Sequence, residues 1–180
     1  MKLKAVYTCT AAAVCALAVA GCSSDSGKQL KYGEMYNVSG KSGGAYGVTV
    51  TGVDKGANAD LSVFSHPSDY AGDTPYYVRY TLTKADDGAV QPDVSLDVSD
   101  GDNRLTLLSL LPSLDFSDPL HPKAEKFDKC DSSSYVDFDK AAKGQTVSEC
   151  EIFLAHQGTG DPKSVAMTQG KSDTAVATWK

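Results

Sequence analysis

The segment Tyr76–Thr83 alternates with a period of two, the pattern of a β-strand that has one face against a core. We expect one face of this strand to be buried and the other to be exposed. The expected buried face holds Tyr76, Val78, Tyr80 and Leu82, and the expected exposed face holds Arg79, Thr81 and Thr83. Since no part of the chain shows sustained helical periodicity, the fold must be built mainly from strands.

Further short segments have the β-branched, alternating composition of strands, and turn residues such as Asp86-Asp87-Gly88 separate them. In the longest of these segments, Cys150, Ile152 and Leu154 share one face, while Glu149 and Glu151 point to the other. Counting Tyr76–Thr83, the chain has about seven predicted strands. This number predicts an all-β, immunoglobulin-like antiparallel β-sandwich. The further strands are expected at 46–53, 94–98, 104–110, 146–155, 164–167 and 174–179.

The stretch Pro112–Gly144 has little periodicity and contains three prolines and many Asp and Ser residues. We interpret it as a long connection with one helical turn near Lys123–Phe127. A connection of this length is unusual inside a compact domain and needs a tie to the rest of the fold.

The N-terminus has the organisation of a secretory signal. Lys2 and Lys4 are followed by the uncharged segment 5–20, which is shorter than a comfortable membrane span. The residues Val19-Ala20-Gly21-Cys22 then resemble the lipobox of bacterial lipoproteins, in which the cysteine carries a diacylglycerol group. The alternatives are an ordinary cleaved signal and a short membrane helix.

These features predict three segments. Residues 1–21 are a lipoprotein signal peptide, residues 22–43 are the lipidated Cys22 and a flexible Ser/Gly-rich tether, and residues 44–180 are the β-sandwich domain. The expected location is the extracytoplasmic face of the cell membrane, with acyl chains such as palmitate as the anchor.

Two cysteines remain in the domain after Cys9 and Cys15 leave with the signal and Cys22 takes the lipid. An even pair in an oxidising compartment predicts a disulfide between Cys130 and Cys150. A redox or metal site is the alternative, although the chain has no CxxC pair and no histidine close in sequence to either cysteine. The net charge of -6 becomes more negative without the signal and argues against nucleic acid as a partner.

A family resemblance rests on several scattered motifs: the lipobox, the Gly47-Val48-Thr49-Val50 strand, the Tyr76–Leu82 strand and Gly144-Gln145-Thr146-Val147. Together they resemble bacterial lipoproteins with an immunoglobulin-like domain of unknown function, over about residues 44–180. The chain departs from that group at Lys84-Ala85-Asp86, after the central strand. The resemblance implies a fold and a location, and no activity.

No motif in the chain predicts an active site. Gly40-Lys41-Ser42 and Gly170-Lys171-Ser172 imitate the end of a phosphate-binding loop, but the required earlier glycine is replaced by Met35 and Val165. There is no Gly-x-Ser-x-Gly elbow. A catalytic triad formed in space is the alternative, although exposed loop histidines without a role are the default. The histidines are His66, His121 and His156.

Metal binding and an aromatic patch are two further hypotheses. The first is a calcium loop near Asp100, although a hairpin turn explains the same composition better. Copper is disfavoured because only Met35 and Met167 survive processing. An outward-facing Tyr77 is the expected centre of a tyrosine patch, although half-buried strand tyrosines are the simpler reading. The calcium candidates are Asp97, Asp100, Asp102 and Asn103, and the other patch candidates are Tyr32, Tyr36, Tyr46 and Tyr70.

The sequence therefore predicts a membrane-anchored, non-catalytic binding or structural module of the cell envelope, held through Cys22 and engaging an unknown envelope protein or ligand. It predicts no enzyme activity, no cofactor and no metal. The alternatives are a lipoprotein that binds a small ligand or a metal ion and, ranked last, a hydrolase.

Overall fold

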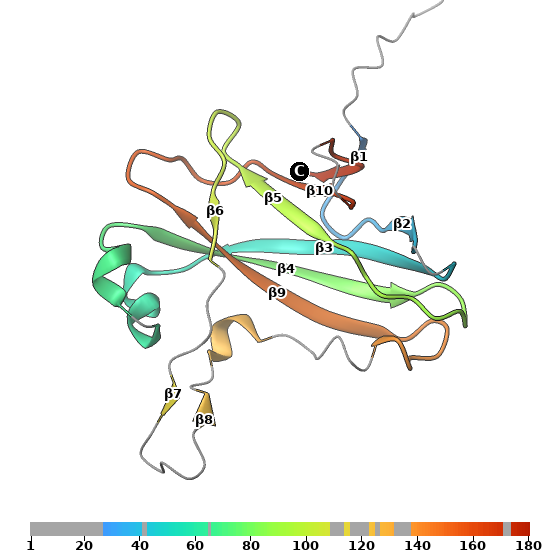
Figure 1. The fold of residues 1–180 in the computed structure, drawn as a ribbon. Helices are drawn as coiled ribbons and strands as arrows, with labels where there is room; N and C mark the ends of the chain where they lie inside the picture. Colours follow the sequence, from blue (N-terminus) through green and yellow to red (C-terminus); the bar gives the residue numbers. More distant parts are fainter. Residues whose placement is uncertain are drawn as a thin grey trace, which may run out of the picture.

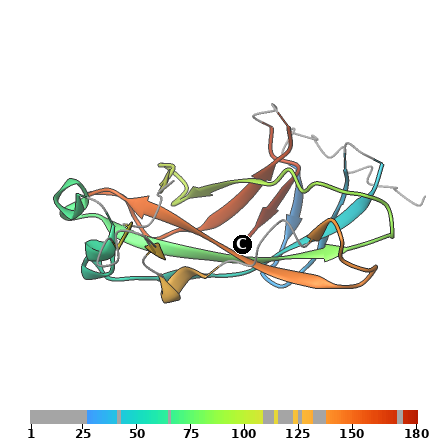
Figure 2. The ribbon, with the colours of Figure 1, turned by 60° about the horizontal axis from the view of Figure 1, so that its bottom comes forward.

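A computed structural model describes residues 27–40, 43–64, 66–108, 114–115, 123–124, 127–131, 138–170 and 174–180. Two sheets pack face to face, as the edge-on view in Figure 2 shows. The five-stranded sheet has the order β2-β3-β4-β9-β6, and the four-stranded sheet has the order β1-β11-β10-β5. This arrangement confirms the expected all-β sandwich, although its two sheets hold nine described strands where about seven were expected.

The five-stranded sheet is built on three long antiparallel strands, which cross the centre of Figure 1. They are β3 (Ala45–Lys55), β4 (Thr74–Lys84) and β9 (Thr146–Ala155). A bulge between Val50 and Gly52 shifts the β3–β4 register. The short strands β2 (Tyr36–Ser39) and β6 (Thr106–Leu107) form the two edges of this sheet.

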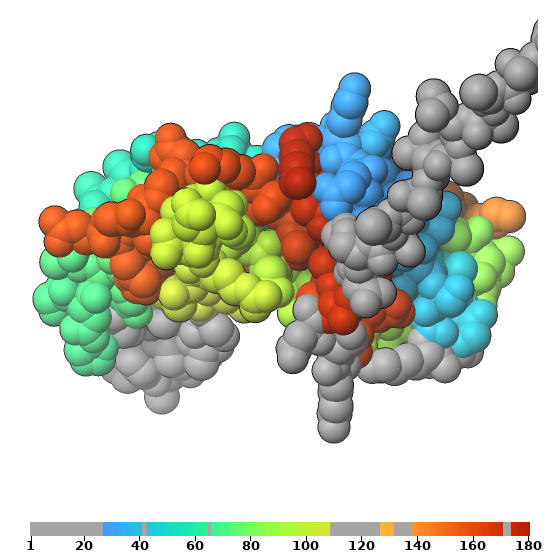
Figure 3. Space-filling view, turned by 90° about the horizontal axis from the view of Figure 1, so that it is seen from above, coloured from blue at the N-terminus to red at the C-terminus, as the bar shows by residue number. Residues whose placement is uncertain are grey.

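The four-stranded sheet contains β1 (Lys28–Leu30), β5 (Ser95–Ser99), β10 (Ser164–Thr168) and β11 (Ala177–Trp179). The predicted terminal hairpin is β10–β11, with Val165 opposite Trp179. β1 pairs with β11 in parallel, in an otherwise antiparallel sandwich. Figure 3 shows the molecule from above; the parts of the chain that supply β1, in blue, and β10 and β11, in red, lie near its middle.

The first strands correct the predicted domain boundary. Residues 28–30 and 36–39 were expected to belong to a flexible tether, yet they form β1 and β2. Their Leu30 and Val38 side chains are buried in the main core. The sandwich therefore begins before residue 44. The sequence pattern did not predict these two strands because each buries a single apolar residue and lies between Ser- and Gly-rich segments.

The core lies between the sheets and contains the predicted buried face of β4, with Tyr76, Val78, Tyr80 and Leu82 at most 4% exposed. On β9 the predicted alternation is correct, but the glutamates face the other sheet and the apolar residues lie on the outer face. Glu149 and Glu151 share the inner face with Tyr80 and Val78, their partners on β4. Cys150, Ile152 and Leu154 lie on the outer face, where a second apolar cluster covers the latter two.

That second cluster explains why the outer face of the sheet can hold apolar residues. Two 3-10 helices, η1 (Asn58–Val63) and η2 (Pro67–Tyr70), connect β3 to β4 at one end of the sandwich. They bring buried Leu61 and Phe64 to Leu154. The helices lie at the left of Figure 1. The cluster is completed by partly buried Val63, Tyr70, Leu108, Phe127 and Ile152.

The long connection after β6 is described only in part. Its described elements are β7 (Leu114–Asp115), β8 (Lys123–Ala124) and the 3-10 turn η3 (Asp128–Cys130). The helical turn expected near Lys123–Phe127 is therefore misplaced: residues 123–124 are extended, and the turn comes afterwards. The predicted disulfide joins Cys130 of η3 to Cys150 of β9, with a Cα–Cα distance of 5.3 Å. It ties this connection to the outer face of the sheet.

Candidate functional site

A charged hollow of about 610 Å³ lies on the outer face of the five-stranded sheet. The end of β3, the following turn, η1 and η3 form its walls, and β4 forms its floor. We call it the outer hollow. Its lining residues are Asp54, Lys55, Gly56, Ala57, Asp60, Tyr77, Arg79 and Lys129.

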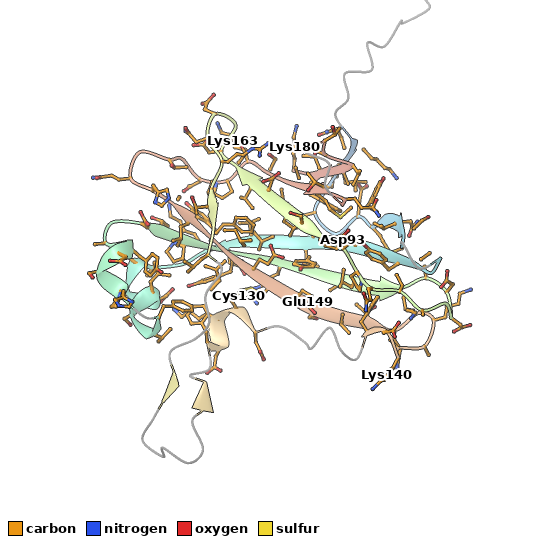
Figure 4. The ribbon with its side chains drawn as sticks, viewed as in Figure 1. Asp93, Cys130, Lys140, Glu149, Lys163 and Lys180 are labelled. Carbon is orange, nitrogen blue, oxygen red and sulfur yellow. A yellow bond between two sulfur atoms is a disulfide. The ribbon has the colours of Figure 1, made fainter. Side chains whose placement is uncertain are left out.

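The disulfide places one wall of the outer hollow. Cys150 lies directly opposite Arg79 across β9 and β4, so both side chains project from the same face. Lys129 precedes the bonded Cys130 and is held beside that arginine. Arg79 donates from Nη2 to the Lys129 carbonyl at 2.6 Å, and from Nε to Asp54 Oδ2 at 2.8 Å. Figure 4 labels Cys130 next to η3.

Asp60 is the most enclosed charge of the outer hollow, with a side chain only 10% exposed. It accepts hydrogen bonds from Lys129 Nζ at 2.5 Å, from the Tyr77 hydroxyl at 2.9 Å and from the Ala57 amide at 2.9 Å. The bonds from Lys129 and then Ala57 lower the pKa of Asp60. Asp60 therefore stays ionised and fixes the position of Lys129.

Tyr77 corrects the predicted tyrosine patch. It was expected to face outward and exposed, yet it is only 4% exposed, because η1 and Phe127 cover the face it occupies. Burial raises its pKa, and the bond to Asp60 adds to the effect. Among the other candidates, Tyr46 is buried in the core and Tyr36 packs against it. Tyr70 packs in the second cluster and Tyr32 is 36% exposed, so the five candidates form no shared exposed patch.

A second arrangement joins three side chains at the same end of the sandwich. His156, directly after β9, lies with Nδ1 at 3.0 Å from Asp73 Oδ1 and Nε2 at 3.0 Å from Thr106 Oγ1. Asp73 directly precedes β4, and Thr106 opens β6. We call this set the Thr106–His156–Asp73 relay. Of its members, the sequence singled out only His156.

The remaining histidines lie elsewhere. His66 precedes η2 with a backbone φ of 59° and is exposed, and His121 lies outside the described residues. The two Gly-Lys-Ser segments also fall partly outside them, at residues 41–42 and 171–172, and so does Cys22. Within the described part of the chain, no helix is long and apolar enough to span a membrane.

The proposed calcium loop is a hairpin turn held by Asp100. Its carboxylate accepts backbone hydrogen bonds from Asp102, Asn103 and Gly160, at 2.8, 2.6 and 2.8 Å. These donors, led by the Asn103 amide, lower the pKa of Asp100. Asp97 instead lies 3.7 Å from Arg104. In the described ranges, no three His, Cys, Asp or Glu side chains gather as metal ligands.

Another hollow, of about 680 Å³, lies at the opposite end of the sandwich, between the β4–β5 loop and the segment before β9. Asp93 and Lys140, both labelled in Figure 4, belong to its lining. Beneath it, Lys84 is 1% exposed, donates to the Asp139 carbonyl at 2.9 Å and lies over the Phe138 ring. The buried ammonium thus anchors the segment before β9 and serves the fold.

Sequence reasoning missed most of both sites because their residues come from distant parts of the chain. Arg79 and Lys129 are 50 residues apart, and Asp73 and His156 are 83 apart. The only signal was positional: His156 directly follows the predicted strand 146–155, Thr106 lies near the start of the predicted strand 104–110, and Asp73 lies shortly before the predicted strand Tyr76–Thr83. Pairing those ends requires the order of strands in the sheet, which the sequence pattern does not contain.

Comparison with known proteins adds a fold relationship. A solved structure of MPT63, a secreted protein from Mycobacterium tuberculosis, aligns with a TM-score of 0.52 and 13% sequence identity. The alignment covers 87% of this chain and 99% of MPT63. No protein-family model matches the chain, and no curated protein matches it. At this identity the likeness shows the β-sandwich fold alone.

Proposed function

We propose that the chain is a lipid-anchored extracytoplasmic protein that binds an anionic component of the cell envelope at the outer hollow. The observation that carries the proposal is the exposed Arg79 guanidinium, which the disulfide-tied wall holds in a fixed position. Pre-organised arginine is well suited to carboxylate and phosphate recognition, because its planar donors match two oxygens at once.

The outer hollow contains two acidic side chains: Asp54, which an incoming anion can displace from Arg79, and Asp60, which stays bound to Lys129. Asp54 forms an ion pair with Arg79, and their side chains are 61% and 43% exposed, respectively. Exposed pairs of this kind contribute only about 0–1 kcal/mol, so an incoming anion can take the place of Asp54 at little cost. Asp60 is enclosed and has three donors, so it remains with Lys129.

The anchor is supported by the N-terminal sequence. Lys2 and Lys4, the uncharged segment 5–20 and the Val19–Cys22 motif have the order of a lipoprotein signal. A diacylglycerol thioether on Cys22 holds a soluble domain at a membrane without a spanning helix, because two acyl chains suffice. The description of MPT63 as secreted and the Cys130–Cys150 disulfide both favour an export route.

Palmitate labelling tests the anchor. Cells that express the full chain are expected to incorporate labelled palmitate into it, and the Cys22→Ala variant is expected to lose the label. Cys9→Ala is the matched control and keeps it, because Cys9 lies within the signal. Label on Cys22→Ala, or none on the unaltered chain, would contradict the anchor.

Site-specific cross-linking tests the binding surface. A photo-crosslinker at Thr51, whose hydroxyl donates to the Arg79 carbonyl, reports on the outer hollow in intact membranes. We expect Arg79→Glu to reduce the cross-linked product about tenfold or more, and Asp54→Ala to increase it. Arg104→Glu, in the turn after β5, is the matched charge reversal and leaves it unchanged. If Arg79→Glu and Arg104→Glu reduced the cross-linked product equally, the effect would come from net charge alone, and the outer hollow would be rejected as the binding site.

A further inference from the structure

The Thr106–His156–Asp73 relay has the connectivity of a nucleophile, a base and a group that orients the base. The two contacts of the imidazole are each 3.0 Å long and use different ring nitrogens. This is the arrangement by which hydroxyl nucleophiles are activated on unrelated folds. It is independent of the outer hollow and extends beyond the binding role proposed above.

The direction of the hydrogen bonds follows from the groups involved. An ionised carboxylate only accepts, so Asp73 holds the imidazole proton on Nδ1. In the neutral ring Nε2 is then an acceptor, and the Thr106 hydroxyl donates to it. The relay therefore selects the tautomer in which His156 can remove the proton of Thr106.

The relay is rigid at its carboxylate end and open at its hydroxyl end. Asp73 is 8% exposed, and its backbone is held by Tyr70 and by the Asn58 side chain, which donates to the Asp73 carbonyl at 2.8 Å. His156 has a 58% exposed side chain, and Thr106 is exposed. A substrate can therefore reach the hydroxyl without any movement of the group that orients the base.

The surroundings of Thr106 indicate the kind of substrate. Thr106 lies opposite Leu154 in the β6–β9 pair, so both side chains are on the face that carries the second apolar cluster. Leu108, two residues along, is partly buried in that cluster. Leu107, next to Thr106 in β6, is 48% exposed, so accessible apolar side chains accompany the hydroxyl and suit the hydrocarbon part of an ester. Figures 1 and 3 both place the η1–η2 segment and the chain after β9 together at this end.

We propose that Thr106 is the nucleophile of an acyl-transfer site for carboxylic esters with an apolar acyl group. Thr106 Oγ1 attacks the carbonyl carbon while its proton passes to His156 Nε2. The tetrahedral intermediate then collapses, the bond to the leaving alcohol oxygen breaks, and that oxygen takes the proton from His156. Water hydrolyses the acyl-threonine by the same route, which releases the acid and restores the hydroxyl. Asp73 is a positioning residue.

Covalent labelling tests the proposal on the purified full-length protein. An alkyl fluorophosphonate is expected to phosphonylate Thr106 with loss of fluoride, and peptide mass spectrometry locates the adduct. Thr106→Val should remove the adduct, and His156→Gln should slow labelling by about 100-fold or more. Thr106→Ser keeps labelling, because serine retains the hydroxyl. His66→Asn is the matched control and labels at the original rate.

A different result is expected if the three side chains of the relay only hold the strand ends together. In that case the variants change only the thermal midpoint, and no adduct forms on Thr106 in the unaltered protein. Asp73→Asn separates the positioning role: we expect slow labelling in a folded variant and partial recovery in Asp73→Glu. Absence of an adduct, or an adduct that persists in Thr106→Val, would overturn the proposal. Neither result bears on cross-linking at Thr51, so the two proposals fail separately.

Discussion

The hydroxyl of Tyr80 donates a 3.1 Å hydrogen bond to Glu151 Oε1 on the inner face of the five-stranded sheet. A glutamate on a core-facing strand position is unusual, because desolvation disfavours its charged form. Burial raises the pKa of Glu151, and the bond from Tyr80 opposes that rise. The sandwich therefore carries an acidic side chain whose charge makes the folded state less stable.

Replacing Glu151 by glutamine should stabilise the protein at pH 7. Because the folded-state pKa lies above the ordinary value, the carboxyl is protonated in both states at low pH and destabilises nothing there. As pH rises through the unfolded value of about 4.5, the penalty grows until the folded group has also ionised. Glu151→Gln should raise the free energy of unfolding on the order of 1 kcal/mol at pH 7.

Urea unfolding at pH 7 and at pH 4 checks this prediction. The gain should vanish at pH 4, and Glu34→Gln, an exposed glutamate, should show no gain at either pH. A loss of stability in Glu151→Gln at pH 7 would mean that the carboxylate stabilises the fold.

Removal of the disulfide should destabilise the fold and open the outer hollow. Cys130 and Cys150 are 20 residues apart, and closing a loop of that size stabilises a protein by about 3 kcal/mol in the chain-entropy model. The double variant Cys130→Ser, Cys150→Ser should lose about that amount in urea unfolding. Reductant should have the same effect on the unaltered protein and none on the double variant. A reductant-sensitive midpoint in the double variant would point to another cause.

Asp100→Ala should lower the thermal midpoint, because three backbone amides of two turns lose their acceptor. The donors lower the pKa of Asp100, so its stabilising effect is complete above the unfolded value of about 3.8 and disappears as pH falls through the folded one. The midpoint difference between the two proteins should therefore shrink below about pH 3.8. Asp102→Ala, in the same turn, is the control. Added calcium should change neither midpoint.

The pattern of the chain predicts the sandwich and the buried face of β4 because a period of two follows directly from strand geometry. It does not tell which face of β9 meets the other sheet. Burial of Ile152 and Leu154 by η1 and η2 reverses the expected environment, and no local signal marks such a cover. The Cys130–Cys150 bond was predictable because only two cysteines remain in the domain.

The sites were harder to predict than the fold. Asp73 and Thr106 are ordinary loop and edge-strand residues, and they meet His156 only because β4, β6 and β9 are neighbours in one sheet. The strand positions of Tyr77 and Arg79 were predicted from the sequence. They become part of a hollow only because the disulfide holds η3 against the sheet as one of its walls. Long-range pairing therefore determines both sites, and periodicity does not report it.

The single tryptophan should report whether the N-terminal strands are docked. Trp179 is fully buried, its Nε1 donates to the Glu34 carbonyl at 2.8 Å, and β11 pairs with Leu30 through the same residue. We expect blue-shifted emission from the folded protein, because the indole is shielded from water. Deleting residues 28–39 should shift the emission to the red and lower the thermal midpoint, since the deletion removes β1, β2 and the indole's acceptor. Deleting only residues 23–26, which precede β1, should leave both unchanged. Equal spectra for the two deletions would mean that residues 28–39 act as a tether after all.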